Sequence, residues 1–197
     1  MMLHDVVKVN THYTRSINLE RDSSSVDVVN SYIPTSRAIR TFARISGAFN
    51  SESMPRAWSL IGPYGSGKSS FSVFLSQLLS NPSDKGTRIA QRVLRGSEAT
   101  LAEQFTREIK DTDGYLRVLI TGAPESMAKR LLRGFADASE AYWRSMPGRN
   151  PRILNDLKDA AERDVSTSEF MELIEELQGR LSKTQCKGIL LIIDELG

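Results

Sequence analysis

The sequence contains a single cysteine, Cys186, and only two histidines, His4 and His12. One cysteine excludes an internal disulfide, and its place beside an expected strand favours a small, half-buried packing role. The histidines have no partner pattern, so neither is assigned to a metal. No apolar run approaches the ~20 residues that cross a bilayer, and residues 1–10 lack the apolar core of a signal peptide. We therefore expect no membrane contact and a cytoplasmic location.

An excess of charge of one sign is also missing. Lysine and arginine total 26, aspartate and glutamate total 24, and the formal net charge is +2. A near-neutral total neither supports nor excludes nucleic acid, because a basic patch can exist within it. The 197 residues, 40% of them hydrophobic and 25% charged, suit one globular domain with a real core.

Apolar residues recur at regular spacing along most of the chain after residue 35. The expected helices cover 36–48 with Thr35 as N-cap, 68–79, 89–109 with a break near 96–97, 125–143, and a stretch that opens at the capping box 166–169. The expected strands cover 57–61, 115–121 and 188–193. Strands that alternate with helices predict an α/β fold with parallel crossovers. The last strand is apolar throughout, which is typical of strands covered on both faces.

The segment 62–69 reads GPYGSGKS and matches the pattern G-x-x-x-x-G-K-[ST], between an expected strand and an expected helix. Its glycines let backbone N–H groups face phosphate oxygens, and the helix N-terminus adds a positive dipole end. Lys68 can reach the β and γ phosphates, and the Ser69 hydroxyl can ligate Mg²⁺. The residues expected to bind nucleotide are Gly62, Pro63, Tyr64, Gly65, Ser66, Gly67, Lys68, Ser69 and Ser70. The sequence therefore predicts binding of ATP, or a close analogue, with Mg²⁺; the competing explanation is a chance glycine turn.

The strand expected at 188–193 ends in Asp194 and Glu195. A carboxylate at the C-terminal end of a parallel strand lies in the crevice where open α/β sheets bind ligands. We expect Asp194 to hold Mg²⁺ through water, opposite Ser69, and Glu195 to accept a proton from the attacking water. The alternative is a plain solvated strand end, and the loop at 62–69 favours the catalytic interpretation.

Together, GPYGSGKS and ILLIIDE resemble the Walker A and Walker B motifs of P-loop ATPases of the AAA+ and related type, over residues 57–197. In that group a catalytic glutamate directly follows the Walker B aspartate, so the resemblance implies catalytic roles for Glu195 and Lys68 and metal-binding roles for Ser69 and Asp194. It also implies a three-layer sandwich around a mostly parallel sheet. RecA-like ATPases fit less well, because they take this glutamate from another strand. ABC-type ATPases carry an LSGGQ-like signature that residues 170–184 lack.

The resemblance also implies a division of the chain. Residues 1–50 are expected to be an N-terminal extension with a short helix, and residues 51–197 the N-terminal part of the ATPase domain, with a helical insertion at 122–186. Related ATPases continue beyond the Walker B strand with a sensor strand, a lid and often an arginine finger. We therefore expect an incomplete sheet, further domains of the same protein and a homo-oligomer. The sequence also resembles large multidomain bacterial P-loop ATPases, some encoded with anti-phage defence genes, but no residue role follows from that likeness.

The leading hypothesis is an ATPase that serves as the motor or assembly module of a larger protein. The alternative is a nucleotide-gated switch with little turnover, and a phosphotransferase is disfavoured because no acceptor site is recognisable. Nucleic acid stays open as a partner: Arg130, Arg133 and Arg144 share one arc of a helical wheel, but Asp137 lies within it and favours a solvated mixed face.

Overall fold

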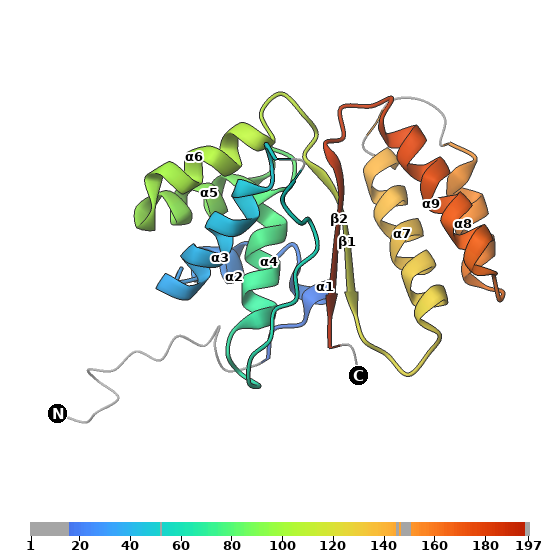
Figure 1. Ribbon diagram of the computed structural model, residues 1–197, viewed down its shortest axis with the longest axis horizontal. Coiled ribbons are helices and arrows are strands. Elements are labelled where there is room, and N and C mark those ends of the chain that lie inside the picture. The colour runs from blue at the N-terminus through green and yellow to red at the C-terminus, as the bar shows by residue number, and fades with distance from the viewer. Residues whose placement is uncertain (1–15, 52, 145, 147–150, 196–197) are drawn as a thin grey trace.

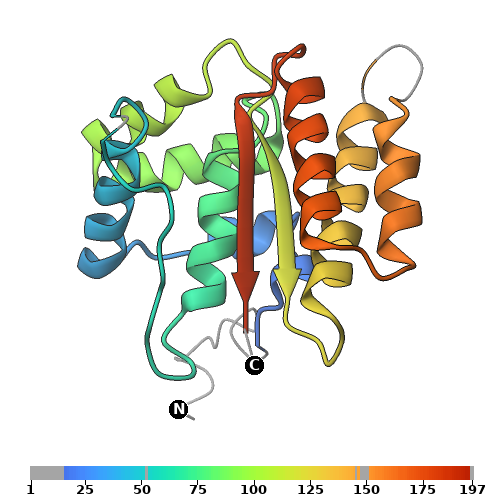
Figure 2. The same cartoon turned by 45° about the vertical axis from the view of Figure 1, so that its right-hand side comes forward.

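A parallel pair of strands forms the centre of the computed structural model, which describes residues 16–51, 53–144, 146 and 151–195. Strand β1 (Tyr115–Thr121) lies beside β2 (Gly188–Asp194), with Tyr115 opposite Gly188 and Thr121 opposite Asp194. Figure 2 shows that both arrows point the same way, so Thr121 and Asp194 lie at the same edge of the sheet.

Helices cover both faces of this sheet (Figure 1). One side carries α1 (Leu19–Asp22), α2 (Val26–Asn30), α3 (Ser36–Gly47), α4 (Lys68–Leu78), α5 (Lys85–Ser97) and α6 (Ala99–Glu108). The other side carries α7 (Met127–Arg144), α8 (Ile153–Ala161) and α9 (Thr167–Leu181). None of the helices in the described ranges combines the length and the apolar character needed to span a membrane.

Two hydrophobic clusters lie on opposite faces of the strands. On the first face, Phe42 of α3 stacks on Phe71 of α4 with ring centroids 4.5 Å apart, and Phe105 of α6 meets it edge to face. Leu119 and Leu190 of the strands pack against that cluster. The second cluster joins alternate residues of β1 to the facing helices; its members include Leu116, Val118, Ile120, Leu132, Phe135, Leu157 and Leu177. Because side chains alternate along a strand, both faces of β1 are covered.

Local sequence signals place several helix and strand ends as expected. The Thr35 hydroxyl accepts the Ala38 N–H at the start of α3, and the Ser166 hydroxyl accepts the Glu169 N–H at the start of α9. The break between α5 and α6 falls after Ser97. The expected strands at 115–121 and 188–193 are confirmed. The helices expected at 36–48, 68–79, 89–109 and 125–143, and the one after the capping box 166–169, are also present, with ends that differ by a few residues.

The expected buried strand at 57–61 is wrong. These residues form no strand, are exposed, and are drawn as a loop in Figure 2. Ile61 is 93% exposed and Trp58 is 41% exposed. A strand needs a neighbour for its N–H and C=O groups, and in the described part of the chain β2 pairs with β1 alone. Apolar composition without a pairing partner therefore does not make this segment a strand.

Residues 16–50 contain three helices rather than a single short one. Leu19 of α1, Val29 of α2 and Phe42 of α3 are fully buried in the cluster that also contains α4. This part of the expected extension therefore packs on the helix that follows the glycine-rich loop. The expected domain division near residue 50 stays a prediction.

Candidate functional site

The glycine-rich loop ends directly at the first turn of α4. Gly65 and Gly67 have φ angles of +75° and +85°, a left-handed conformation that glycine adopts without strain. Gly67 is the N-cap of α4, and its carbonyl accepts the Phe71 N–H at 2.9 Å. The N–H groups at the start of a helix have no partner within it, so this end of α4 offers free donors and a positive dipole end. Such an arrangement suits a bound anion.

The ammonium of Lys68 folds back over this loop. Its Nζ lies 3.0 Å from the carbonyl oxygens of Gly62 and Pro63, to which it donates hydrogen bonds. Both acceptors are backbone groups of the loop itself, so the charge has no carboxylate partner among the described residues. If a phosphate bound here, Lys68 would donate to a charged acceptor in place of two neutral carbonyls. Hydrogen bonds between charged groups are stronger than those to neutral acceptors.

The loop also meets the end of β2. The Ser69 hydroxyl donates a 2.5 Å hydrogen bond to Oδ2 of Asp194. Ser69 occupies the first turn of α4, and Asp194 is the last residue of β2. A hydroxyl and a carboxylate, both oxygen donors, are thereby brought together beside the helix N-terminus.

Gly122 belongs to this site although the sequence marked it only as the end of a strand. Its N–H donates a 2.8 Å hydrogen bond to the carbonyl of Asp194, which extends the pairing of β1 with β2 by one step. A Cβ at Gly122 would lie 1.7 Å from the carbonyl oxygen of Glu195, so a side chain does not fit there. The available signal was a glycine directly after an apolar strand, which marks a close backbone approach.

Glu195 is exposed and makes no hydrogen bond or ion pair within the described ranges. Its φ of +58° is unusual for a residue with a side chain. Glu195 follows Asp194 directly, and no contact among the described residues holds its carboxylate in one orientation.

The remaining expected nucleotide contacts line an open loop. Tyr64 is 86% exposed, and its hydroxyl lies 3.1 Å from that of Ser16. The Ser66 N–H donates to the Pro63 carbonyl, which closes a turn within the loop. Ser70 lies in the first turn of α4 and its side chain makes no hydrogen bond among the described residues. The structure thus brings Lys68, Ser69 and Asp194 to one place.

The donor set fits Mg²⁺ better than a metal that needs a protein cage. In the part of the chain that the structure describes, no group of three or more His, Cys, Asp and Glu residues could hold a metal. Mg²⁺ usually keeps several waters and takes one or two carboxylates together with substrate phosphates. One hydroxyl from Ser69 and one carboxylate from Asp194 meet that requirement.

The arginines of α7 are matched by carboxylates. Arg130 pairs with Glu20 and Glu125, and Arg133 pairs with Glu125 at 3.0 Å. Arg144 lies 3.5 Å from a carboxylate one helical turn earlier. These pairs make the helix surface mixed in charge, as the aspartate on the same arc suggested.

The site is thus built from the start of α4, the end of β2 and the turn after β1, which are far apart in the sequence. The role of the site is inferred from this geometry together with the sequence pattern at 62–69 and 194–195. Comparisons of the chain with protein-family models, with curated proteins and with solved structures found no match.

Proposed function

We propose that this chain binds ATP with Mg²⁺ at residues 62–70 and hydrolyses it, as the motor or assembly module of a larger protein of the AAA+ or a related type. The observation that carries the proposal is the hydrogen bond between Ser69 and Asp194. It places a carboxylate from a parallel strand end beside the hydroxyl of the G-x-x-x-x-G-K-[ST] pattern, and both residue types are needed for a nucleotide with its metal ion.

Each group of the site has a role in this proposal. The N–H groups at the start of α4 and the ammonium of Lys68 bind the phosphates, and Lys68 leaves the carbonyls of Gly62 and Pro63 to do so. Ser69 and Asp194 hold Mg²⁺. When bound, the ion neutralises charge on the phosphate oxygens. Glu195 accepts a proton from the attacking water, a role that typically contributes about 10²–10⁴-fold to a rate.

A nucleotide-gated switch with little turnover is the second candidate, and the conformation of Glu195 favours it. That side chain is exposed, and among the described residues it has no hydrogen bond or ion pair that would direct it toward a water molecule. Rate depends steeply on position, since about 1 Å of misplacement can lower a rate about 100-fold. Binding and turnover therefore have to be measured separately.

The test is a titration of a fluorescent ATP analogue into the wild type and Lys68→Ala, with and without Mg²⁺. We expect saturable binding that Lys68→Ala weakens strongly, because the substitution removes the charge directed at the phosphates. Lys85→Ala is the matched control, since Lys85 is an exposed lysine at the start of another helix. Equal affinity of Lys68→Ala and the wild type would rule out this binding site.

Phosphate release measured on the same samples separates the two candidates. Turnover of the wild type above that of Lys68→Ala, alone or with DNA or RNA added, supports the ATPase. Tight binding without turnover supports the switch.

A further inference from the structure

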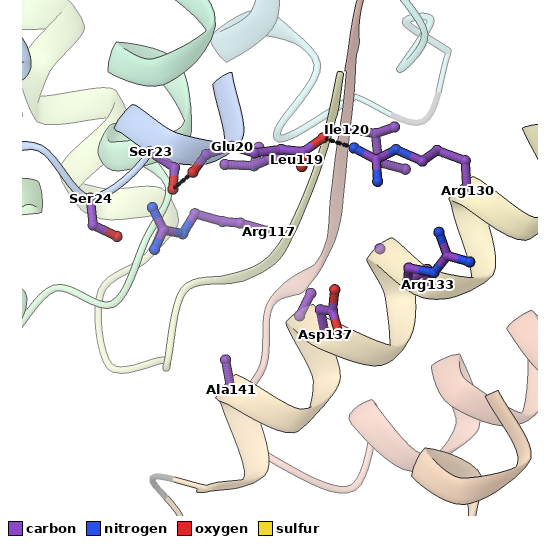
Figure 3. Close-up of a pocket in the computed structure, with 12 residues that line it drawn as sticks. Glu20, Ser23, Ser24, Arg117, Leu119, Ile120, Arg130, Arg133, Asp137 and Ala141 are labelled. Carbon is purple, nitrogen blue, oxygen red and sulfur yellow. Dashed lines mark hydrogen bonds and ion pairs between the residues drawn. The ribbon is translucent and has the colours of Figure 1, made fainter. Parts of the chain in front are cut away.

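A pocket of about 300 Å³ lies along the outer edge of β1, between the turn after α1 and helix α7 (Figure 3). Its polar lining includes Ser23, Ser24, Arg117 and Asp137, and its apolar lining includes Leu119, Ile120, Ala138 and Ala141. None of its lining residues belongs to the loop at 62–69. The pocket is therefore a separate feature of the molecule, and binding of a ligand in it does not depend on the proposed ATPase activity.

Arg117 is a charged side chain in the middle of β1. In Figure 3 its guanidinium extends toward the turn that carries Ser23 and Ser24. Its Nη1 atom is buried and has no hydrogen-bond partner, and no ion pair with Arg117 occurs in the described part of the chain. Burial lowers the pKa of this guanidinium, and the nearby charge of Asp84 opposes that shift. Arginine nevertheless stays protonated in proteins, so a charged group with unused donors lies in the pocket.

Of the other charged residues in the lining, Glu20, Arg130 and Arg133 are engaged with partners, whereas Asp137 has no ion pair among the described residues. Glu20 accepts hydrogen bonds from the Thr121 N–H and from Arg130. Arg133 pairs with Glu125 outside the pocket. Asp137 is exposed on α7 and makes no ion pair with Arg117. Arg117 is therefore the one cation of this lining that forms no ion pair among the residues described.

The unmatched charge and the lining together select a kind of ligand. A single guanidinium matches a singly charged anion, and its planar fork matches a carboxylate with two parallel hydrogen bonds. The carboxylates of Glu20 and Asp137 would repel a dianion such as a phosphate monoester. The Ser23 hydroxyl donates to the Glu20 carbonyl at 2.8 Å, whereas the Ser24 hydroxyl makes no hydrogen bond to any residue that the structure describes. The apolar side chains of the lining suit a short carbon chain.

We propose that this pocket binds an organic monocarboxylate, whose carboxylate accepts hydrogen bonds from Arg117 and from the Ser24 hydroxyl. The carbon chain lies against Leu119, Ile120 and the alanines of α7. The carboxylate belongs either to a free small acid or to the side chain of an acidic peptide, and the chemistry at Arg117 is the same for both.

The first experiment is a thermal melt of the full chain in butyrate, at constant ionic strength. The matched control is butyramide, which has the same carbon chain and no charge. We expect melting temperature to rise saturably with butyrate, because a ligand that binds only the folded state stabilises it. Butyramide and chloride should give no such rise. Inorganic phosphate is a further arm, and a rise with phosphate that equals or exceeds that with butyrate would overturn the carboxylate assignment.

Two sets of variants test the residues. Arg117→Met keeps an apolar stem and removes the charge, and it should weaken butyrate binding about 10- to 100-fold. Ser24→Glu places a carboxylate in the pocket from an exposed turn, whereas Ser24→Gln is the neutral counterpart of the same length. The glutamate variant should lose the response to butyrate and the glutamine variant should keep most of it.

The two Ser24 variants test whether the pocket binds butyrate even if Arg117→Met does not fold. A butyrate response that survives in Ser24→Glu, or that butyramide reproduces in the wild type, would overturn the proposal. A blocked tripeptide with a central glutamate identifies the source of the carboxylate: tighter binding than butyrate assigns the pocket to an acidic peptide, and weaker binding assigns it to a free acid.

Discussion

The Ser69 hydroxyl donates a 2.5 Å hydrogen bond to Asp194, although 125 positions of the chain separate the two residues. The bond joins the first turn of α4 to the end of β2, and both groups are partly buried. Because the acceptor is a carboxylate, this contact belongs to the stronger class of hydrogen bonds. It links the stability of the fold to the geometry of the proposed nucleotide site.

Removing either partner of this bond should destabilise the chain. We expect Ser69→Ala and Asp194→Asn each to lower the free energy of unfolding by about 1–3 kcal/mol. In the double variant the losses should be less than additive, because the second change removes a bond that is already absent. Urea unfolding of the four proteins gives the coupling directly. Full additivity would mean that the two groups do not interact in solution.

Glu195→Gln should separate binding from hydrolysis. The amide keeps the size of the side chain and cannot accept a proton, so affinity for ATP should stay within about twofold while phosphate release falls about 10²–10⁴-fold. Asp194→Asn serves as the comparison, since it should weaken binding only when Mg²⁺ is present. If both variants simply lost ATP binding, the division of roles between the two acids would be wrong.

Because the segment at 57–61 is exposed, substitutions in it should have little effect on the free energy of unfolding. Ile61→Ala should change the free energy of unfolding by no more than about 0.5 kcal/mol, because Ile61 is 93% exposed. The same substitution at Ile120, which is 1% exposed, should lower it by about 2–5 kcal/mol. Urea melts of the two variants test the pair. A large loss at Ile61 would show that this segment is buried in solution.

Gly122→Ala should disturb the end of β2. The added Cβ would overlap the Glu195 carbonyl, and forced overlaps of this kind lower stability by about 1–3 kcal/mol or more. Gly96→Ala is the control, because a Cβ there meets nothing within 4 Å and helix propensity should raise stability by up to about 1 kcal/mol. Thermal melts compare the two, and an ATP analogue shows whether Gly122→Ala also weakens Mg²⁺-dependent binding. Equal stability of both variants would contradict the close approach.

Alkaline pH should destabilise the protein through Tyr32. Its ring stacks on Phe74, and burial raises the pKa of its phenol from 10.0 to about 12. The fold therefore favours the neutral phenol, so this stabilisation is complete below pH 10 and is lost as the pH rises toward 12. Tyr32→Phe should lose less stability over that interval. Urea unfolding at intervals across it is the measurement, and an identical loss in both proteins would show that Tyr32 titrates normally.

The helices and strands with regular apolar spacing could be predicted from the sequence, because that spacing reflects the face that each one buries. The short helices α1 and α2 could not, and α8 was expected only as an unspecified part of the helical insertion. The four residues of α1 carry no periodic signal, and the helix starts where Asn18 accepts the Arg21 N–H and is held by the burial of Leu19. Burial against distant residues is not visible in so short a segment.

The pairing of strands and the pairing of charged side chains could likewise not be predicted from the sequence. Residues 57–61 have the composition of a strand, but composition does not reveal whether a neighbour is present. The motif at 62–69 and the acids at 194–195 could be found by pattern, whereas their connection through Ser69 is a property of the folded chain. Arg117 is visible in the strand YLRVLIT, but its lack of an ion pair among the described residues depends on residues from α1 and α7.

The carboxylate of Glu20 accepts the Thr121 N–H at 2.6 Å and also pairs with Arg130, so one side chain near the start of the chain secures the end of β1 and the beginning of α7. These contacts span 101 and 110 positions. Contacts between residues so distant in sequence require a long loop to close, which carries an entropic cost. We therefore expect the docking of α1 to be a late folding event. Hydrogen exchange at the Thr121 amide would report its opening separately from the unfolding of the core.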